Sequence, residues 1–287
     1  MITQEQMQKE LELIIRNGIR EDIGEGDHSS LACIPEDAKG KAKLLVKEHG
    51  VIAGVECSRM IFKQVDAGLE MEVLITDGEE VDPGDTVFYV TGSSRSILMA
   101  ERLVLNVMQR MSAIATKTRK FVDVLKGTST QVLDTRKTTP GIRALEKWAV
   151  KIGGGVNHRF GLYDMIMLKD NHIDFAGGID LAIQKTKDYL RENDLDLKII
   201  VEARDLDEVA QILRHEGIYR ILIDNFSFSD TEKAVRMIGD KCQTESSGGI
   251  TLQNARRYAE CGVDFISSGA LTHSVHNMDL SLKAIES

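Results

Sequence analysis

Apolar and polar residues follow three successive patterns in the first half of the chain. Between residues 2 and 20 the apolar positions fall on one face of a helix. Residues 40–92 show short apolar runs broken by turns that contain Gly or Pro, which predicts strands and hairpins. A 3.6-residue period then returns over residues 94–125 and predicts a long helix.

After residue 130, strand-like and helix-like segments alternate. The strand-like segments are 131–137, 164–170, 197–203, 219–225, 242–249 and 263–270. The helix-like segments are 143–152, 179–193, 205–217, 229–239 and 251–262. Strands made of short apolar runs and separated by helices predict a parallel sheet covered by helices. Six such units fit an incomplete α/β barrel better than a dinucleotide fold, because no GxGxxG motif follows a strand.

Composition narrows the class of protein. The chain has 287 residues, 42% of them hydrophobic, and a formal net charge of −9, which argues against general binding to nucleic acid through the phosphate backbone. No apolar run is long enough to span a membrane, and the first helix lacks the apolar core of a signal peptide. The four cysteines show no CxxC spacing, so neither a zinc site nor a disulfide framework is indicated. We therefore expect a cytoplasmic enzyme.

Polar residues follow each predicted strand of the second half. In an α/β barrel the carboxyl ends of the strands meet at one mouth, where the chemistry takes place. The residues expected to project over that mouth are Arg136, Lys169, Glu202 and Asp224. Polar loops are common on any protein surface, but a charged residue directly after each of several apolar strands favours a binding site.

Positive charge is concentrated in residues 131–172, which hold seven Lys or Arg and four acidic residues. Three of these cations, Arg143, Lys147 and Lys151, have helical spacing and are interpreted as one solvated helix face. The others, Arg136, Lys137, Arg159 and Lys169, lie in or beside strands and Gly-rich loops. They predict a pocket for a compact polyanion, in which Arg binds carboxylate or phosphate in a bidentate manner.

Two turns with glycine follow the last two predicted strands, at residues 246–249 and 267–269. Small residues allow backbone N–H groups to approach phosphate oxygens, so these turns predict a phosphate site. Glu202 and Asp224 suit sugar hydroxyls or a Mg²⁺ ion shared with substrate phosphates, although structural pairing with a nearby cation is an alternative. His158 and His172 are candidates for acid–base work, but no HxH or HExxH spacing supports zinc, and His273 is a candidate phosphate donor.

Two rival functions are considered. Lys169 ends a predicted barrel strand, as the Schiff-base lysine of an aldolase would, but the charges expected around it disfavour the desolvated lysine that such chemistry needs. The segment DGEEVDPGDTVFYV resembles the strands of a biotinyl or lipoyl carrier domain, but it lacks an exposed lysine at a hairpin tip.

The motifs DTRKTTPG, GGGVNHR and LKDNH together closely resemble quinolinate phosphoribosyltransferase, also called nicotinate-nucleotide pyrophosphorylase (carboxylating). The resemblance extends over REDIGEGDHSS, AERLVLNVMQRMSAIAT, VEAR, LIDN, ESSGGI and SSGALTHS. HSSLACI departs from the Thr pair that is more usual in the family. A related group associated with molybdenum transport shares the GGG-x-x-HR run but tends to lack KDNH, so it is kept as the alternative.

The resemblance implies the type II phosphoribosyltransferase fold of class α/β, which is an α/β sandwich beside an incomplete α/β barrel. It implies an N-terminal sandwich domain at 1–112, against which a C-terminal helix at 274–287 packs back, and a barrel domain at 113–273. It further implies a homodimer with shared active sites, or a hexamer built from such dimers.

The implied reaction is that of a pentosyltransferase of de novo NAD biosynthesis. Quinolinate and 5-phosphoribosyl 1-diphosphate, with Mg²⁺, give nicotinate mononucleotide, diphosphate and CO₂. The implied catalytic residues are Lys137, Lys169, Glu202 and Asp224, and the last two also hold the metal indirectly. The implied substrate-binding residues are these four with Arg102 from the partner subunit, Thr135, Arg136, His158, Arg159, Ser246, Ser247, Gly248, Ser267, Ser268, Gly269 and His273.

Overall fold

The computed structural model describes residues 3–285, which form two compact units. One unit, here called the parallel-sheet unit, holds residues 120–137 and 155–270. The other, called the antiparallel-sheet unit, holds the described residues of 3–119, 138–154 and 271–285. The two units follow packing rather than sequence order, and the domain boundaries expected at 112/113 and 273/274 stay a prediction.

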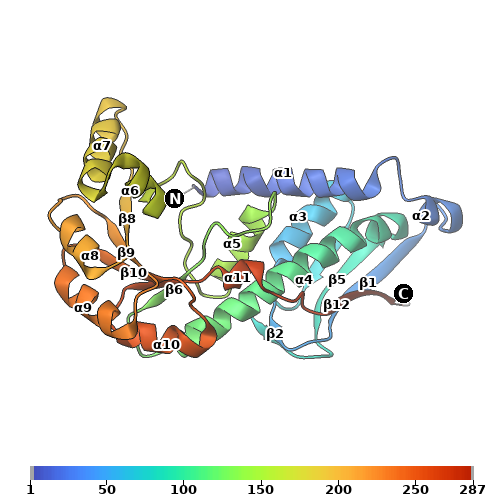
Figure 1. The fold of residues 1–287 in the computed structure, drawn as a ribbon. Helices are drawn as coiled ribbons and strands as arrows, with labels where there is room; N and C mark the ends of the chain where they lie inside the picture. The colour runs from blue at the N-terminus through green and yellow to red at the C-terminus, as the bar shows by residue number, and fades with distance from the viewer. Residues whose placement is uncertain (1–2, 286–287) are drawn as a thin grey trace. The chain divides into compact units, whose positions relative to one another are not determined.

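The parallel-sheet unit contains six strands in the order β6-β11-β10-β9-β8-β7. Their bounds are β6 Gln131–Leu133, β7 Ile166–Leu168, β8 Ile199–Ala203, β9 Arg220–Asp224, β10 Gln243–Ser247 and β11 Phe265–Ser267. The connecting helices are α6 Asp170–Ala176, α7 Ile179–Glu192, α8 Leu206–Ile212, α9 Phe228–Ile238 and α10 Leu252–Glu260. All strand pairs are parallel, and α8, α9 and α10 lie along the outer side of the strands (Figure 1).

This arrangement follows from the apolar runs. All five residues of β8 are buried, as expected for a strand covered on both faces. β6 and β7 are the two ends of the sheet and are not paired with each other among the described residues. The expected α/β class with an incomplete barrel is therefore confirmed.

Side chains on the inner face of this sheet form layers. Because successive side chains of a strand point to opposite faces, residues two apart share a face. Met167, Ile200 and Leu222 make an apolar layer. The strand registers place Glu245 beside Leu222, so Glu245 belongs to the same layer. Glu202 lies beside Leu222 on the other side, and Asp224 ends β9 two residues further along, at the carboxyl edge.

The antiparallel-sheet unit contains a four-stranded sheet in the order β12-β1-β5-β3 and a separate pair, β2-β4. The strands are β1 Lys39–Val46, β2 Gly50–Val51, β3 Glu70–Val73, β4 Glu80–Val81, β5 Thr86–Ser93 and β12 Leu280–Ile285. The helices are α1 Gln4–Ile23, α2 His28–Cys33, α3 Val55–Val65, α4 Ser94–Val124, which runs on into the other unit, α5 Arg143–Ile152 and α11 Ala270–His273. Its core includes an edge-to-face contact of Phe62 with Phe88.

One glycine shows how closely two helices of this unit approach. A Cβ at Gly153, just after α5, would lie 2.5 Å from the Ala115 carbonyl oxygen and 2.7 Å from Cβ of Thr118, both on α4. The first glycine of the GGG run is therefore needed for packing.

Two expectations for this unit are wrong. A helix was expected at 274–287, but residues 280–285 form β12, which pairs antiparallel with β1, and residues 286–287 lie outside the described residues. Leu280 and Leu282 alternate with more exposed neighbours, and this two-residue period favours a strand. Residues 55–65 were included in a region of short strands but form α3, because Val55, Ser58 and Phe62 share one buried helical face.

The cationic face expected on residues 143–151 is also wrong in part. Lys147 is buried together with its neighbour Glu146, whereas Lys151 is exposed. Glu146 accepts hydrogen bonds from Arg110 and Thr139 inside the same unit, so this face of α5 is used for packing.

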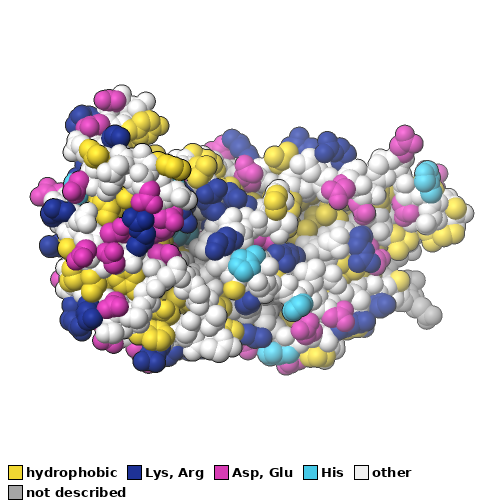
Figure 2. Space-filling model, viewed as in Figure 1, with side chains coloured by type: hydrophobic (Ala, Val, Ile, Leu, Met, Phe, Trp, Pro, Cys, Tyr) yellow, Lys and Arg dark blue, Asp and Glu magenta, His cyan; other side chains and the backbone are white. Residues whose placement is uncertain are grey.

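The surface carries both charges. Figure 2 shows basic and acidic side chains interspersed over the visible face of the molecule. Among residues 3–285, no helix combines the length and the apolar character required to cross a membrane.

Candidate active site

The candidate site is built on neighbouring parallel strands. Lys169 directly follows β7, Glu202 lies in β8, Asp224 ends β9 and Ser247 ends β10. The register pairs Glu202 with Leu222, and Ser247 with Asp224. Since these strands are adjacent and parallel, the structure brings the four residues together at the carboxyl edge of one sheet.

The carboxylate of Glu202 is buried, and its hydrogen-bonding and charged partners offset only part of the cost of burying a charge. The Asp170 backbone N–H donates to it at 3.2 Å, and Lys169 Nζ lies 4.0 Å from its Oε2. Burial raises the pKa of Glu202, and the like charge of Asp224 raises it further. A cation or a hydroxyl donor placed between these two carboxylates would relieve both effects.

Lys169 is poorly suited to Schiff-base chemistry. Its side chain is 51% exposed, and its ammonium group lies 4.0 Å from the Glu202 carboxylate. A Schiff-base lysine works best in a desolvated pocket, and an exposed ammonium beside a carboxylate is the opposite arrangement. The structure therefore favours an electrostatic role for Lys169 over the lyase alternative.

Arg159 provides a buried positive charge. Its guanidinium donates to the Met165 carbonyl oxygen at 3.0 Å, and the residue is 6% exposed. Burial lowers the pKa of Arg159, and the nearby charge of Arg136 lowers it further. Two guanidinium groups close enough to repel each other form a site that an anion would stabilise.

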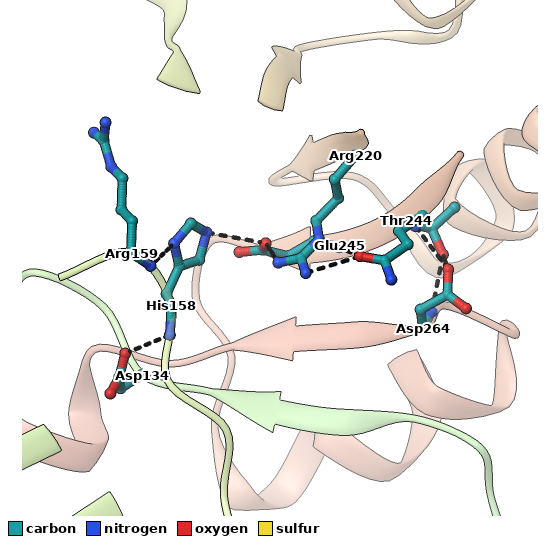
Figure 3. A network of polar contacts seen from close by, with 8 residues as sticks. Asp134, His158, Arg159, Arg220, Thr244, Glu245 and Asp264 are labelled. Carbon is teal, nitrogen blue, oxygen red and sulfur yellow. Dashed lines mark hydrogen bonds and ion pairs between the residues drawn. The ribbon is translucent and has the colours of Figure 1, made fainter. Parts of the chain in front are cut away.

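His158 connects Arg159 to a buried network (Figure 3). Nδ1 of His158 accepts a hydrogen bond from the Arg159 backbone N–H at 2.6 Å, and its own backbone N–H donates to Asp134 at 2.8 Å. Nε2 of His158 lies 3.2 Å from Glu245 Oε2. The loop that carries Arg159 is thus held from both sides.

Glu245 is the centre of that network. It is fully buried, and Arg220 donates to its Oε2 at 2.8 Å. His158 and Arg220 lower the pKa of Glu245 to about 2, although burial alone would raise it. Glu245 directly precedes the predicted Ser246 in sequence, but it belongs with Arg220 to the buried interior. Nothing in the sequence marks Arg220 as its partner.

The residues of the predicted phosphate-binding turns differ in burial. Ser246, Ser267 and Ser268 are buried, and the Ser268 hydroxyl donates to the Ile250 carbonyl oxygen at 3.0 Å. Ser247 and Gly248 are more accessible. Strand alternation explains the difference on β10, because Ser246 points to the face opposite Ser247. The substrate roles of these serines and of Gly269 stay predictions.

The remaining predicted residues divide between the two units. Thr135, Arg136 and Lys137 follow β6, and the Lys137 backbone N–H donates to the Thr135 hydroxyl at 3.0 Å. Arg102, on α4, and His273, on α11, belong to the antiparallel-sheet unit. Most predicted residues of the parallel-sheet unit therefore lie at or just after the carboxyl ends of its strands, and the roles of all the predicted residues, Arg102 and His273 included, stay predictions.

The described residues show no metal-binding cluster made by protein side chains alone. No group of three or more His, Cys, Asp or Glu side chains is arranged to hold a metal ion within residues 3–285. Glu202 and Asp224 are a carboxylate pair, and Mg²⁺ is usually bound by one or two carboxylates together with substrate phosphates. These two residues fit a metal that arrives with its substrate.

Comparison with known proteins identifies the family of this chain. Family models described as the N-terminal and C-terminal domains of quinolinate phosphoribosyl transferase match residues 27–112 and 114–283. A protein from Oryza sativa named nicotinate-nucleotide pyrophosphorylase (carboxylating), chloroplastic, is 44% identical, with 96% of this chain and 77% of the relative covered. A Synechocystis protein with the name probable nicotinate-nucleotide pyrophosphorylase (carboxylating) is 38% identical, with 94% and 91% covered.

A solved structure extends the likeness to the fold. The crystal structure of NadC from Streptococcus pyogenes matches with a TM-score of 0.89 and 35% identity, and covers 100% of this chain and 99% of that one. Because both family models match and the relatives cover nearly the whole sequence, the chain belongs to the quinolinate phosphoribosyltransferase family.

Proposed function

We propose that this chain transfers the phosphoribosyl group of 5-phosphoribosyl 1-diphosphate to quinolinate, with loss of CO₂, to form nicotinate mononucleotide and diphosphate for NAD biosynthesis. The observation that carries the proposal is that one unit holds two neighbouring cations and, separately, two neighbouring carboxylates. Arg136 and Arg159 are close enough to lower a pKa, and Glu202 and Asp224 are close enough to raise one. Family membership supplies the substrates that match these two groups.

The cations suit quinolinate, which is a dicarboxylate. Arg159 and Arg136 each present a planar guanidinium, the group that binds carboxylates in a bidentate manner. Lys169 adds a flexible positive charge at the end of β7. Holding the diacid in this way would orient its ring nitrogen toward the ribose, and such orientation accounts for a large share of catalysis in many enzymes.

The carboxylates suit the ribose. As the C1–O bond to diphosphate breaks, its electron pair leaves with the diphosphate and positive charge develops on the ribose carbon. Glu202 and Asp224 would accept hydrogen bonds from the ribose hydroxyls and stabilise that charge. We propose Mg²⁺ as the cofactor, held by these two residues with the substrate; when bound it would neutralise the leaving diphosphate. Lys137 and Lys169 would assist from the protein side.

Decarboxylation needs little further help from the protein. Attack by the ring nitrogen makes a pyridinium. When the adjacent carboxylate leaves as CO₂, the electron pair of the broken C–C bond stays on the ring carbon, where the neighbouring positive nitrogen stabilises it, and this carbon then takes a proton. We therefore assign no nucleophilic residue to this step.

The direct test is an assay of nicotinate mononucleotide formation with quinolinate, and with nicotinate as the control substrate. We expect product from quinolinate only, and a strong loss of activity on removal of Mg²⁺ by a chelator. Product from nicotinate alone, or no turnover of quinolinate, would refute the proposed substrate. The second result would restore the molybdenum-transport-associated alternative.

We also propose a homodimer in which Arg102 of one subunit completes the site of the other, with a cytoplasmic location. The support is that Arg102 is exposed on α4 and is separate in sequence from the other cations. Mixed dimers of Arg102→Ala and Lys169→Ala should recover part of the activity that each variant loses alone. An absence of complementation would exclude a shared site, and cell fractionation would test the location.

A further inference from the structure

The turn after β9 has an unusual backbone. Asn225 directly follows Asp224 and adopts φ 56°, in the left-handed region. Among the described residues, Asp194 with φ 50° is the other non-glycine residue in this region. Left-handed backbone is unfavourable for residues with a Cβ, and it persists where surrounding contacts hold it in place. The contacts of Asn225 should therefore explain its conformation.

Those contacts all involve the end of β10 or the carboxylate of Asp224. The Asn225 backbone N–H donates to the Ser247 carbonyl oxygen at 2.9 Å. The Asn225 side-chain amide donates to Asp224 Oδ2 at 2.7 Å, and the Ser247 hydroxyl donates to Asp224 Oδ1 at 2.5 Å. Each oxygen of the carboxylate thus receives one hydrogen bond from a different side chain. Two donors on two oxygens fix the plane of a carboxylate, whose terminal torsion is otherwise broad.

Gly248 makes room for this arrangement. Its φ is 86°, and a Cβ at this position would lie 2.1 Å from Oδ1 and 2.4 Å from Cγ of Asn225. Such contacts do not occur in folded proteins, so any side chain at 248 would force the Asn225 amide to move. The glycine expected for close approach to phosphate is therefore also required by the neighbouring strand end.

We propose that Asn225 is a positioning residue for Asp224: its left-handed backbone and its amide, seated against Gly248, hold the Asp224 carboxylate in the orientation that receives the ribose of 5-phosphoribosyl 1-diphosphate. The inference rests on the proposed function of Asp224. Asn225 acts through Asp224 and itself contacts no reacting atom. A pre-oriented carboxylate needs no reorganisation when charge develops on the sugar.

The test variant is Asn225→Gly. Glycine adopts the left-handed backbone without strain, so the substitution removes the amide while preserving the turn. The matched control is Asp194→Gly, which makes the same change of backbone preference in the loop between α7 and β8, at the amino end of the strands. Both variants should fold, because neither introduces backbone strain, and circular dichroism checks this.

We expect Asn225→Gly to lower kcat/KM for 5-phosphoribosyl 1-diphosphate roughly 10-fold or more, because a hydrogen bond to a charged group is lost. The KM for quinolinate should not change, and Asp194→Gly should behave as the unmodified chain. Calorimetric titration with the diphosphate sugar in the absence of quinolinate should show the same weakening without reliance on turnover. Equal kinetics and equal binding for the two glycine variants would overturn the inference.

A second comparison tests the role of Gly248. Gly248→Ala should lower activity, and the loss should be smaller when it is introduced into Asn225→Gly, because the clashing amide is then absent. Equal losses in both backgrounds would show that the glycine does not act through Asn225. Failure of the proposed function is recognised separately, since the unmodified chain would then make no nicotinate mononucleotide.

Discussion

Two glutamates of the parallel sheet, Glu202 on β8 and Glu245 on β10, face the same side and have opposite electrostatic environments. Glu202 lies at the carboxyl edge near Asp224, and burial and like charge raise its pKa. Glu245 lies fully buried between His158 and Arg220, and these partners lower its pKa to about 2 against the opposing effect of burial. The two glutamates are both buried, but their different partners give them different roles. An under-compensated carboxylate is prepared for a positive or hydrogen-bonding ligand, whereas a fully paired one stabilises the fold.

The largest expected effect is on the stability contributed by Glu245. Glu245→Ala leaves the Arg220 guanidinium buried without its carboxylate, and breaking a buried ion pair on one side costs on the order of 3–5 kcal/mol. Urea unfolding of the purified chain measures this change. Glu260→Ala, which breaks an exposed pair with Arg256, is the control and should change little. A similar free energy of unfolding for both variants would remove the contrast between the two glutamates.

The next effect concerns catalysis at Glu202. Glu202→Gln should lower kcat by about 100- to 1,000-fold, as expected when one preorganised charge is removed from a transition state. The free energy of unfolding should not fall, because the raised pKa shows that the charged form is disfavoured in the folded chain. Steady-state kinetics and urea unfolding on the same preparation test both statements. A large loss of stability would mean that Glu202 is structural.

A smaller effect is expected for Arg159. Arg159→Ala should raise the dissociation constant of quinolinate about 10- to 100-fold, because charge-assisted hydrogen bonds to a carboxylate are lost. Binding of the diphosphate sugar should change much less. Calorimetry with each substrate separately measures the split, and equal weakening of both would contradict a carboxylate-binding role.

The smallest effects are those of pH on stability, and they have opposite signs at the two sites. The folded-state pKa of Glu245 is depressed to about 2 from 4.5, so its contribution is present above pH 4.5 and is lost as the pH falls toward 2. The pKa of Glu202 is raised, so its contribution is present below 4.5 and is lost as the pH rises through the folded value. Urea unfolding of Glu245→Gln and Glu202→Gln across this range should show differences from the unmodified chain that change in opposite directions. Parallel pH profiles would contradict the pairing described.

Much of this fold was predictable because it depends on local periodicity. The apolar runs after residue 130 and the helices between them specify a parallel sheet, and the charged residues after each run specify its functional edge. The short helix α6 and the strand β12 were not predicted. The strand β12 depends on a neighbour distant in sequence, since it is defined by its pairing with β1.

The residue types of the candidate site were predictable, but which of its polar residues are buried and paired was not. Ser246, Ser247 and Glu245 are adjacent in sequence, and no local pattern shows which of them faces a ligand. The strand alternation, together with Arg220 and His158, decides that Glu245 is internal. Asn225 gave no signal either, because its importance comes from a backbone conformation and from Gly248 on another strand.

The pairing of β12 with β1 has a consequence for synthesis of the chain on the ribosome. The strand β1 can pair on both sides only after residue 280 has been synthesised, because Val46 pairs with Leu280. All six strands of the parallel sheet, in contrast, have been synthesised by residue 267. During translation, β1 therefore presents an open edge that other chains can join. A nascent or C-terminally clipped chain would be prone to aggregate through that edge, and binding of a chaperone to β1 would protect it until the last strand is made.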